Sequence, residues 1–173
     1  MKSFRDVTVG RVGLDEILFN HTRWLAQKGG KRADLTDINL SFIDLRGVDL
    51  SYSLCRRVNI SDSILDKARF VGASMVDAKI ERNSLKKVNW NNADLRFSVF
   101  ACNDMSGCSI NSVLFDNSLI IQSDLRRLVN FDRSASFSGA TIKSSTVSSD
   151  VHAKAVSHNA ELIDVCVDDS GEN

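Results

Sequence analysis

A large apolar side chain recurs at every fifth residue from Leu35 to Leu125, and this period constrains the fold more than any other feature of the chain. An α-helix repeats every 3.6 residues and a β-strand every two, so neither structure alone keeps this register over about ninety residues. The series is Leu35, Leu40, Leu45, Leu50, Cys55, Ile60, Leu65, Phe70, Met75, Ile80, Leu85, Trp90, Leu95, Phe100, Met105, Ile110, Phe115, Ile120 and Leu125.

A second series lies two residues before the first and is mostly small, as at Ala33, Ala68 and Ala93. The residue between the two series is often Asp or Asn, and the residues after each large one are rich in turn formers. Two inward side chains with a polar one between them indicate a short, nearly straight segment followed by a turn.

The triplets Ala33-Asp34-Leu35 and Ala93-Asp94-Leu95 are the best copies of a motif A-(D/N)-L-x-x. In this motif the chain resembles the pentapeptide-repeat family over about two-thirds of its length. The resemblance implies an all-β fold, a right-handed quadrilateral β-helix in which four pentapeptides form each coil of twenty residues. It also implies that both series point into the shaft.

Stacked coils would place residues twenty positions apart on top of one another, ~4.8 Å apart as in any β ladder. The chain has no proline. Proline would remove a backbone donor from such a ladder, so its absence is consistent with this fold.

The repeat breaks after Leu125. The next inward pair is predicted at Val129 and Phe131, and the period of five returns at Ile142 and Val147. Two one-residue insertions at corners would explain the shift. The acidic segment 150–173 is either a degraded coil or a short capping element, and we expect a cap.

The N-terminal segment 1–32 contains apolar residues at helical spacing, which predict an amphipathic helix over about 14–28. This helix would cover the first coil of a β-helix spanning 33–149, where open strand edges would otherwise pair with other chains. The segment also resembles the N-terminal cap of bacterial and bacteriophage pentapeptide proteins, which implies a bacterial or phage origin.

Charge and composition limit the functional classes. The net charge is zero, which argues against a strongly basic nucleic-acid binder or an acidic mimic of DNA. No apolar run is long enough to span a membrane, and the N-terminus does not resemble a signal peptide, so we expect a cytoplasmic protein in a bacterial host cell. The four cysteines have no metal-ligand spacing and are expected to be free thiols.

No catalytic signature is found in the sequence. We therefore expect no enzyme activity, no cofactor and no metal. His21, on the apolar side of the predicted helix, is expected to be a packed histidine that keeps one ring hydrogen bond. A filled shaft would leave no cavity for a substrate.

Two outward surfaces are candidate partner-binding sites. On the third face, positions after the large residues form a basic stripe of Arg46, Lys67, Lys86, Lys87, Arg126 and Arg127. A candidate apolar interface contains Val99, Leu114, Leu119 and Ile121. The stripe suits phosphates or an acidic protein, whereas clustered exposed apolar groups often mark an interface.

These surfaces support three hypotheses. The first is a non-enzymatic rod that engages and inhibits or modulates a bacterial host protein, as a phage or mobile-element factor that includes counter-defence among its roles. The second is nucleic-acid or gyrase-related binding through a charged face. Some family members bind DNA gyrase by resembling duplex DNA, but they are markedly acidic and this chain is not. The third is a structural protein that self-associates, for example as a homodimer.

Overall fold

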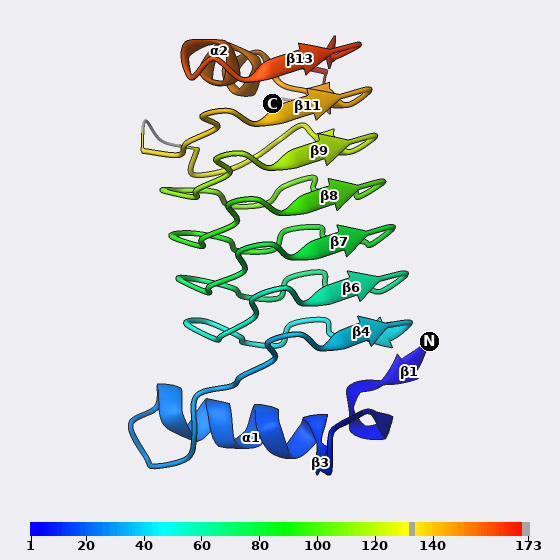
Figure 1. The fold of residues 1–173 in the computed structure, drawn as a ribbon, viewed down its shortest axis with the longest axis vertical. Helices are drawn as coiled ribbons and strands as arrows, with labels where there is room; N and C mark the ends of the chain where they lie inside the picture. The colour runs from blue at the N-terminus through cyan, green and yellow to red at the C-terminus, as the bar shows by residue number, and fades with distance from the viewer. Residues whose placement is uncertain (132–133, 171–173) are drawn as a thin grey trace.

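The structure, a computed structural model, describes residues 1–131 and 134–170. It is a column of stacked coils with helix α1 across one end and helix α2 at the other (Figure 1). Helix α1 spans Leu14–Leu25, α2 spans Ser149–Ser157 and a 3-10 turn spans Phe4–Asp6. The strands are β1 (Lys2–Ser3), β2 (Thr8–Val9), β3 (Val12–Gly13), β4 (Asn39–Ser41), β5 (Ile43–Asp44), β6 (Asn59–Ser61), β7 (Lys79–Glu81), β8 (Val99–Ala101), β9 (Leu119–Ile121), β10 (Asp124–Leu125), β11 (Thr141–Lys143), β12 (Thr146–Val147), β13 (Glu161–Ile163) and β14 (Cys166–Val167).

Each coil has four sides, which we number from the large inward residue of the first coil: face 1 at Leu35, face 2 at Leu40, face 3 at Leu45 and face 4 at Leu50. Face 2 is a seven-stranded parallel sheet in the order β13-β11-β9-β8-β7-β6-β4. In this sheet Leu40 pairs with Ile60, twenty positions later. The other faces are held mainly by single parallel bridges with the same offset. The predicted all-β solenoid is confirmed.

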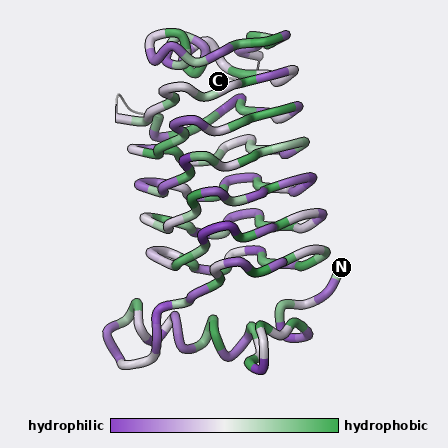
Figure 2. Tube along the Cα trace, in the orientation of Figure 1, coloured by the Kyte–Doolittle hydropathy of each residue, from purple (hydrophilic) through white to green (hydrophobic). Residues whose placement is uncertain are grey.

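Side chains fill the shaft. All the large inward residues from Leu35 to Leu125 are at most 1% exposed. Aromatic rings stack along the core, with ring centroids 4.8 Å apart for Phe70 and Trp90. Figure 2 shows apolar and polar segments alternating along the coils. The alternation arises because each five-residue repeat buries two side chains in the shaft and leaves the other three facing water.

A ladder of buried polar side chains links the coils at the corner between faces 2 and 3. The inward small position of this corner holds Ser63, Asn83, Asn103, Ser123 and Ser145, all of them buried. Each side chain accepts a hydrogen bond from the backbone N–H of the corresponding residue one coil below, at distances from 2.9 to 3.2 Å. These positions are therefore polar because a buried backbone donor needs a partner.

The N-terminal segment covers the first coil. Helix α1 buries Leu18 and His21, and β1 pairs with β5 on face 3. The helix ends at Leu25, three residues before the predicted end at 28. Glycine is required at Gly30, where φ is +86° and a Cβ would lie 2.2 Å from the carbonyl oxygen of Asn20.

Of the predicted inward pair, Val129 is wrong, whereas Phe131 is half-buried against the core with its ring centroid 6.4 Å from that of Phe137. Val129 forms a bridge with Ser109, on the outward side of face 4, and is 47% exposed. The offset between coils is still twenty at Val129 but is twenty-two at Ser136, which bridges to Leu114. Both extra residues therefore fall between 129 and 136 rather than at two corners, because the backbone ladder holds Val129 in register.

The C-terminal segment contains both a helix and a further partial coil. Helix α2 buries Val151 and Ala155 against the core. Strands β13 and β14 then pair with β11 and β12, so the ladder continues past residue 149. His158 is half-buried, and its Nδ1 accepts a hydrogen bond from the Phe137 N–H at 3.1 Å.

Candidate functional site

The outward side chains of face 2 form an apolar patch over β8 and β9. Val99 pairs directly with Leu119, and Ala101 pairs with Ile121. All four side chains are half-buried, although their positions face away from the shaft. The structure thus brings together three of the four residues of the predicted apolar interface, together with Ala101.

Two further residues widen this patch. Phe97, at the corner before β8, is 52% exposed, and Cys102 is exposed at the corner after β8. Together with Val99 and Ala101 they make the outward side of this coil apolar across the whole of face 2. Phe97 was not singled out from the sequence. A large apolar residue two positions after Leu95, at an outward turn position, is unusual enough to have identified it.

Charged residues border the face 2 patch, which we define as Phe97, Val99, Ala101, Leu119 and Ile121. On β7, Glu81 forms ion pairs with Lys79 at 3.1 Å and with Arg82 at 3.4 Å. On the other side, the exposed Lys143 of β11 pairs in the ladder with Ile121. An apolar centre with a polar rim is typical of protein–protein interfaces.

Leu114 does not belong to this patch. It bridges to Asp94 and Ser136 on face 1, so a corner of the solenoid separates it from Leu119. The four residues of the predicted apolar interface are therefore divided between two faces.

The six cations of the predicted basic stripe lie on face 3 and at the corner that follows it, but carboxylates pair with three of them. The pairs are Arg46 with Asp44 at 2.5 Å, Lys86 with Asp104 at 3.2 Å, and Arg126 with Asp124 at 2.8 Å and Asp168 at 2.7 Å. The hydrogen bonds from Arg126 lower the pKa of Asp124, as expected for a paired carboxylate. Three of these acids lie between the small and large inward positions, a column that the predicted stripe left out.

Lys67, Lys87 and Arg127 form no salt bridge within the part of the chain that the structure describes. They are exposed in one column at the corner between faces 3 and 4, which runs Gly47, Lys67, Lys87, Gly107 and Arg127, and all five residues have positive φ. The unpaired positive charge is therefore a narrow column along this corner.

His21 joins α1 to the first coil. Its Nδ1 accepts a hydrogen bond from the Ala33 N–H at 3.1 Å, and its ring stacks on Trp24 with centroids 5.6 Å apart. The side chain is fully buried, so the expectation of a packed histidine with one ring hydrogen bond is confirmed. Burial lowers the pKa of the ring, against opposing effects of the Ser51 backbone and the Asp49 carboxylate.

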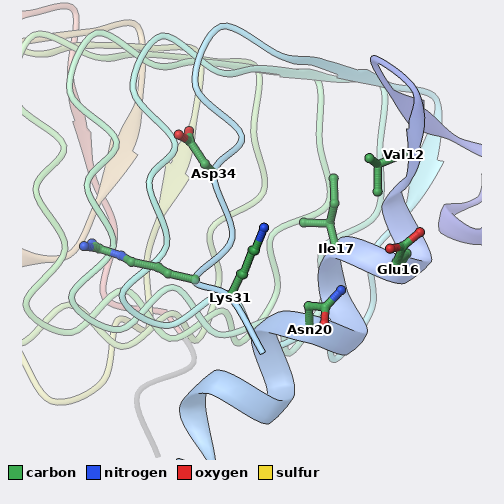
Figure 3. A pocket seen from close by; sticks show the side chains of 7 residues that line it. Val12, Glu16, Ile17, Asn20, Lys31 and Asp34 are labelled. Carbon is green, nitrogen blue, oxygen red and sulfur yellow. The ribbon is translucent and has the colours of Figure 1, made fainter. Parts of the chain in front are cut away.

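A cleft of about 400 Å³ opens between α1 and the edge of face 1. Figure 3 shows Ile17, Asn20 and Lys31 around this space, with Val12 and Glu16 beside them. The lining mixes apolar groups with charges of both signs. It contains no histidine, cysteine or hydroxyl side chain.

Burial raises the pKa of the Cys55 and Cys108 thiols to about 12, so neither is a thiolate at neutral pH. Among residues 1–131 and 134–170, no three His, Cys, Asp or Glu side chains gather as metal ligands. Neither helix within these ranges has the length and apolar character to cross a membrane.

No family model matches the sequence, and no curated protein matches it. Solved structures do resemble the chain. QnrB1, a plasmid-mediated fluoroquinolone resistance protein, superposes with a TM-score of 0.51 at 13% identity, over 80% of this chain and 76% of that one. HetL, a pentapeptide repeat protein from the cyanobacterium Nostoc sp. strain PCC 7120, gives 0.28 at 21% identity, over 73% of this chain and 66% of that one. The chain has the pentapeptide-repeat fold.

In a pentapeptide-repeat solenoid, packing decides the inward columns, and the outward columns are free to vary. A binding surface is therefore expected where outward residues are apolar or carry unpaired charge, unlike an ordinary solvated surface. The face 2 patch is the strongest such departure on the shaft.

Proposed function

We propose that the chain is a non-enzymatic protein-binding module, a rigid rod that engages a bacterial host protein and inhibits or modulates it. The face 2 patch carries this proposal. Val99, Leu119 and Ile121 lie side by side next to the half-exposed Phe97. A partner that covers them gains roughly 25 cal/mol for each Å² of apolar surface removed from water.

The proposal places the protein in the cytoplasm of a bacterial host cell, as a phage or mobile-element factor whose roles include counter-defence. The support for this setting is the resemblance of residues 14–35 to the cap of bacterial and bacteriophage pentapeptide proteins. Gyrase and host defence complexes are the first candidate targets.

The test is affinity capture from bacterial lysate with three baits: the wild-type rod, Leu119→Asp and Val76→Asp. Val76 is a matched control, because it is a half-buried outward apolar residue on face 1. The proposal expects a bacterial protein that wild type and Val76→Asp capture and Leu119→Asp loses. Equal capture by all three baits, or no specific capture, would contradict it.

A second candidate function is nucleic-acid or gyrase-related binding through the basic stripe. The observation that favours it is the unpaired corner column of Lys67, Lys87 and Arg127. Duplex binding by this column should weaken steeply with salt and should be lost when all three are changed to Gln. Unchanged mobility of duplex DNA at low salt rules this function out.

A third candidate is self-association through the same apolar patch, as a homodimer. Sedimentation of wild type and Leu119→Asp separates this function from binding to a host protein. A wild-type monomer removes it, whereas a dimer that Leu119→Asp dissociates supports it.

A further inference from the structure

The N-terminal end of the rod holds cations that form no salt bridge with any carboxylate of the described residues. Residues 1–32 carry seven basic and three acidic groups. The salt bridges of the described residues all lie between Asp37 and Asp168, so none of them includes a cation of this segment. The shaft is different, because arginines there are mostly engaged by neighbouring aspartates.

Aromatic rings accompany these cations. The contacts place Arg5 over Phe4 at 5.9 Å, Arg23 over Phe19 at 6.0 Å and Arg32 over Trp24 at 5.9 Å from the ring centroid. Phe19 is 63% exposed and Trp24 is 37% exposed. Cation–π pairs of this kind leave both the positive charge and much of the ring open to a ligand.

Phe4, Arg5 and Phe19 meet in one groove of about 450 Å³ between the 3-10 turn, α1 and face 4. Two carboxylates also line this groove. Asp49 is paired with Arg69 at 3.2 Å, and Asp15 accepts a hydrogen bond from the Glu16 N–H at 2.9 Å. Asp49 is therefore neutralised by Arg69, whereas Asp15 keeps its negative charge, which is one charge against the two of Arg5 and the neighbouring Arg23.

Arg23 lies next to this groove and is held in place without losing its charge. Its Nε and one terminal nitrogen donate hydrogen bonds to the Lys28 carbonyl oxygen at 3.3 and 3.0 Å. A carbonyl orients the guanidinium but does not neutralise it. We call Phe4, Arg5, Phe19 and Arg23 together the cap groove.

We propose that the cap groove binds single-stranded nucleic acid, with bases stacked on the Phe19 ring and the guanidinium planes and with phosphates contacting Arg5 and Arg23. A positive groove lined by aromatic rings is how proteins hold single strands without reading sequence. The corner column on the shaft offers charge without rings and therefore lacks the stacking surfaces. An acidic polypeptide would use the arginines, whereas the exposed Phe19 ring also offers a stacking surface that suits the π-face of every base.

The test uses fluorescence anisotropy of a labelled ~20-nucleotide oligothymidine, measured from about 50 to about 200 mM salt. The variant Arg5→Gln/Arg23→Gln should lose at least about tenfold in affinity, and its salt slope should fall by about 1.4, the value for two single-strand phosphate contacts. Phe19→Ala should lose at least about fivefold with an unchanged salt slope, because it removes the stacking ring, which is also the cation–π partner of Arg23, but removes no charge. Its ring is mostly exposed, so the fold should tolerate the change.

The control variant Lys67→Gln/Lys87→Gln removes the same charge from the shaft and should bind as wild type. No binding at about 50 mM salt would overturn the proposal. So would equal losses in the cap and shaft variants, tighter binding of a duplex of the same length, or full displacement by polyglutamate. These outcomes leave the protein-binding function untouched, because that function rests on face 2.

Discussion

Asn83 and Asn103 each satisfy a backbone N–H that the solenoid leaves unpaired at the corner between faces 2 and 3. Their side-chain amides also donate to the carbonyl oxygens of Ile60 and Ile80, at 3.0 and 2.8 Å. A buried donor without a partner costs more than a hydrogen bond gains, so these residues matter more for stability than their size indicates.

Asn83→Ala should therefore lower the free energy of unfolding by about 1–3 kcal/mol, because it leaves the Ser63 N–H unpaired in the core and removes the side-chain hydrogen bond to the Ile60 carbonyl. Asn83→Ser should lose less, since serine serves the same role elsewhere in the ladder. Chemical denaturation measures both. Ser74→Ala, at an outward position, is the control, and a loss equal to that of Asn83→Ala would refute the role of the ladder.

His21 should make the rod less stable in mild acid. Burial holds its folded pKa below the ordinary 6.5, so below that pH the unfolded chain binds the proton first. Stability should then fall as pH drops from about 6.5 towards the folded pKa, by no more than about 1.4 kcal/mol per pH unit.

Thermal unfolding between neutral pH and pH ~5 tests this, with His21→Gln and His152→Gln compared. The slope should vanish in His21→Gln, whose amide oxygen can still accept from Ala33, and should persist in His152→Gln. A slope that survives in His21→Gln places the acid sensitivity elsewhere.

Single positions were predictable to different extents. The inward residues were predictable because residues twenty positions apart stack in the same column and fill the same part of the shaft. The pairing of Arg46 with Asp44 was not, because it depends on a neighbouring outward column and on side-chain reach along the face, past Leu45. Phe97 was missed for a related reason: it occupies a turn position, where an apolar residue carries no periodic signal.

At the scale of elements, backbone hydrogen bonding determines which residues face the core in places where the hydrophobic pattern alone gives the wrong answer. The apolar pattern placed Val129 inward, yet the ladder keeps it outward beside Ser109. The pattern likewise could not separate a cap from a degraded coil after residue 149, because α2 is short and is followed by β13 and β14. The N-terminal helix was predictable since its apolar spacing repeats over three turns.

Gly30→Ala tests how tightly α1 is fixed to the first coil. A Cβ there would lie 2.2 Å from the Asn20 carbonyl oxygen, so the helix must shift. Gly47→Ala is the matched control, because it has a positive φ of +68° but nothing within 4 Å of the new Cβ. The control should cost about 1–2 kcal/mol for its left-handed backbone, and Gly30→Ala should cost clearly more. Equal losses in thermal unfolding would contradict the close approach.

At the scale of the whole molecule, the two candidate binding surfaces lie on different parts of the rod. The shaft is filled and its charges are largely paired, so it acts as a rigid support. The face 2 patch lies on β8 and β9, whereas the cap groove lies at the end formed by α1. A partner on face 2 and a nucleic acid at the cap could therefore be held at once without competing for residues.

Hydroxyl-radical footprinting of the rod, alone and with the host protein that it captures, tests the role of face 2 most directly. Phe42, Tyr52 and Phe97 are 59%, 51% and 52% exposed, so their side chains start from similar accessibility, and Phe42 and Tyr52 serve as internal controls for Phe97. We predict that binding protects Phe97, Leu119 and Ile121 from oxidation and leaves Phe42 and Tyr52 unchanged. Protection of Phe42 or Tyr52 with Phe97 and Leu119 still reactive would contradict the assignment of face 2 as the binding surface.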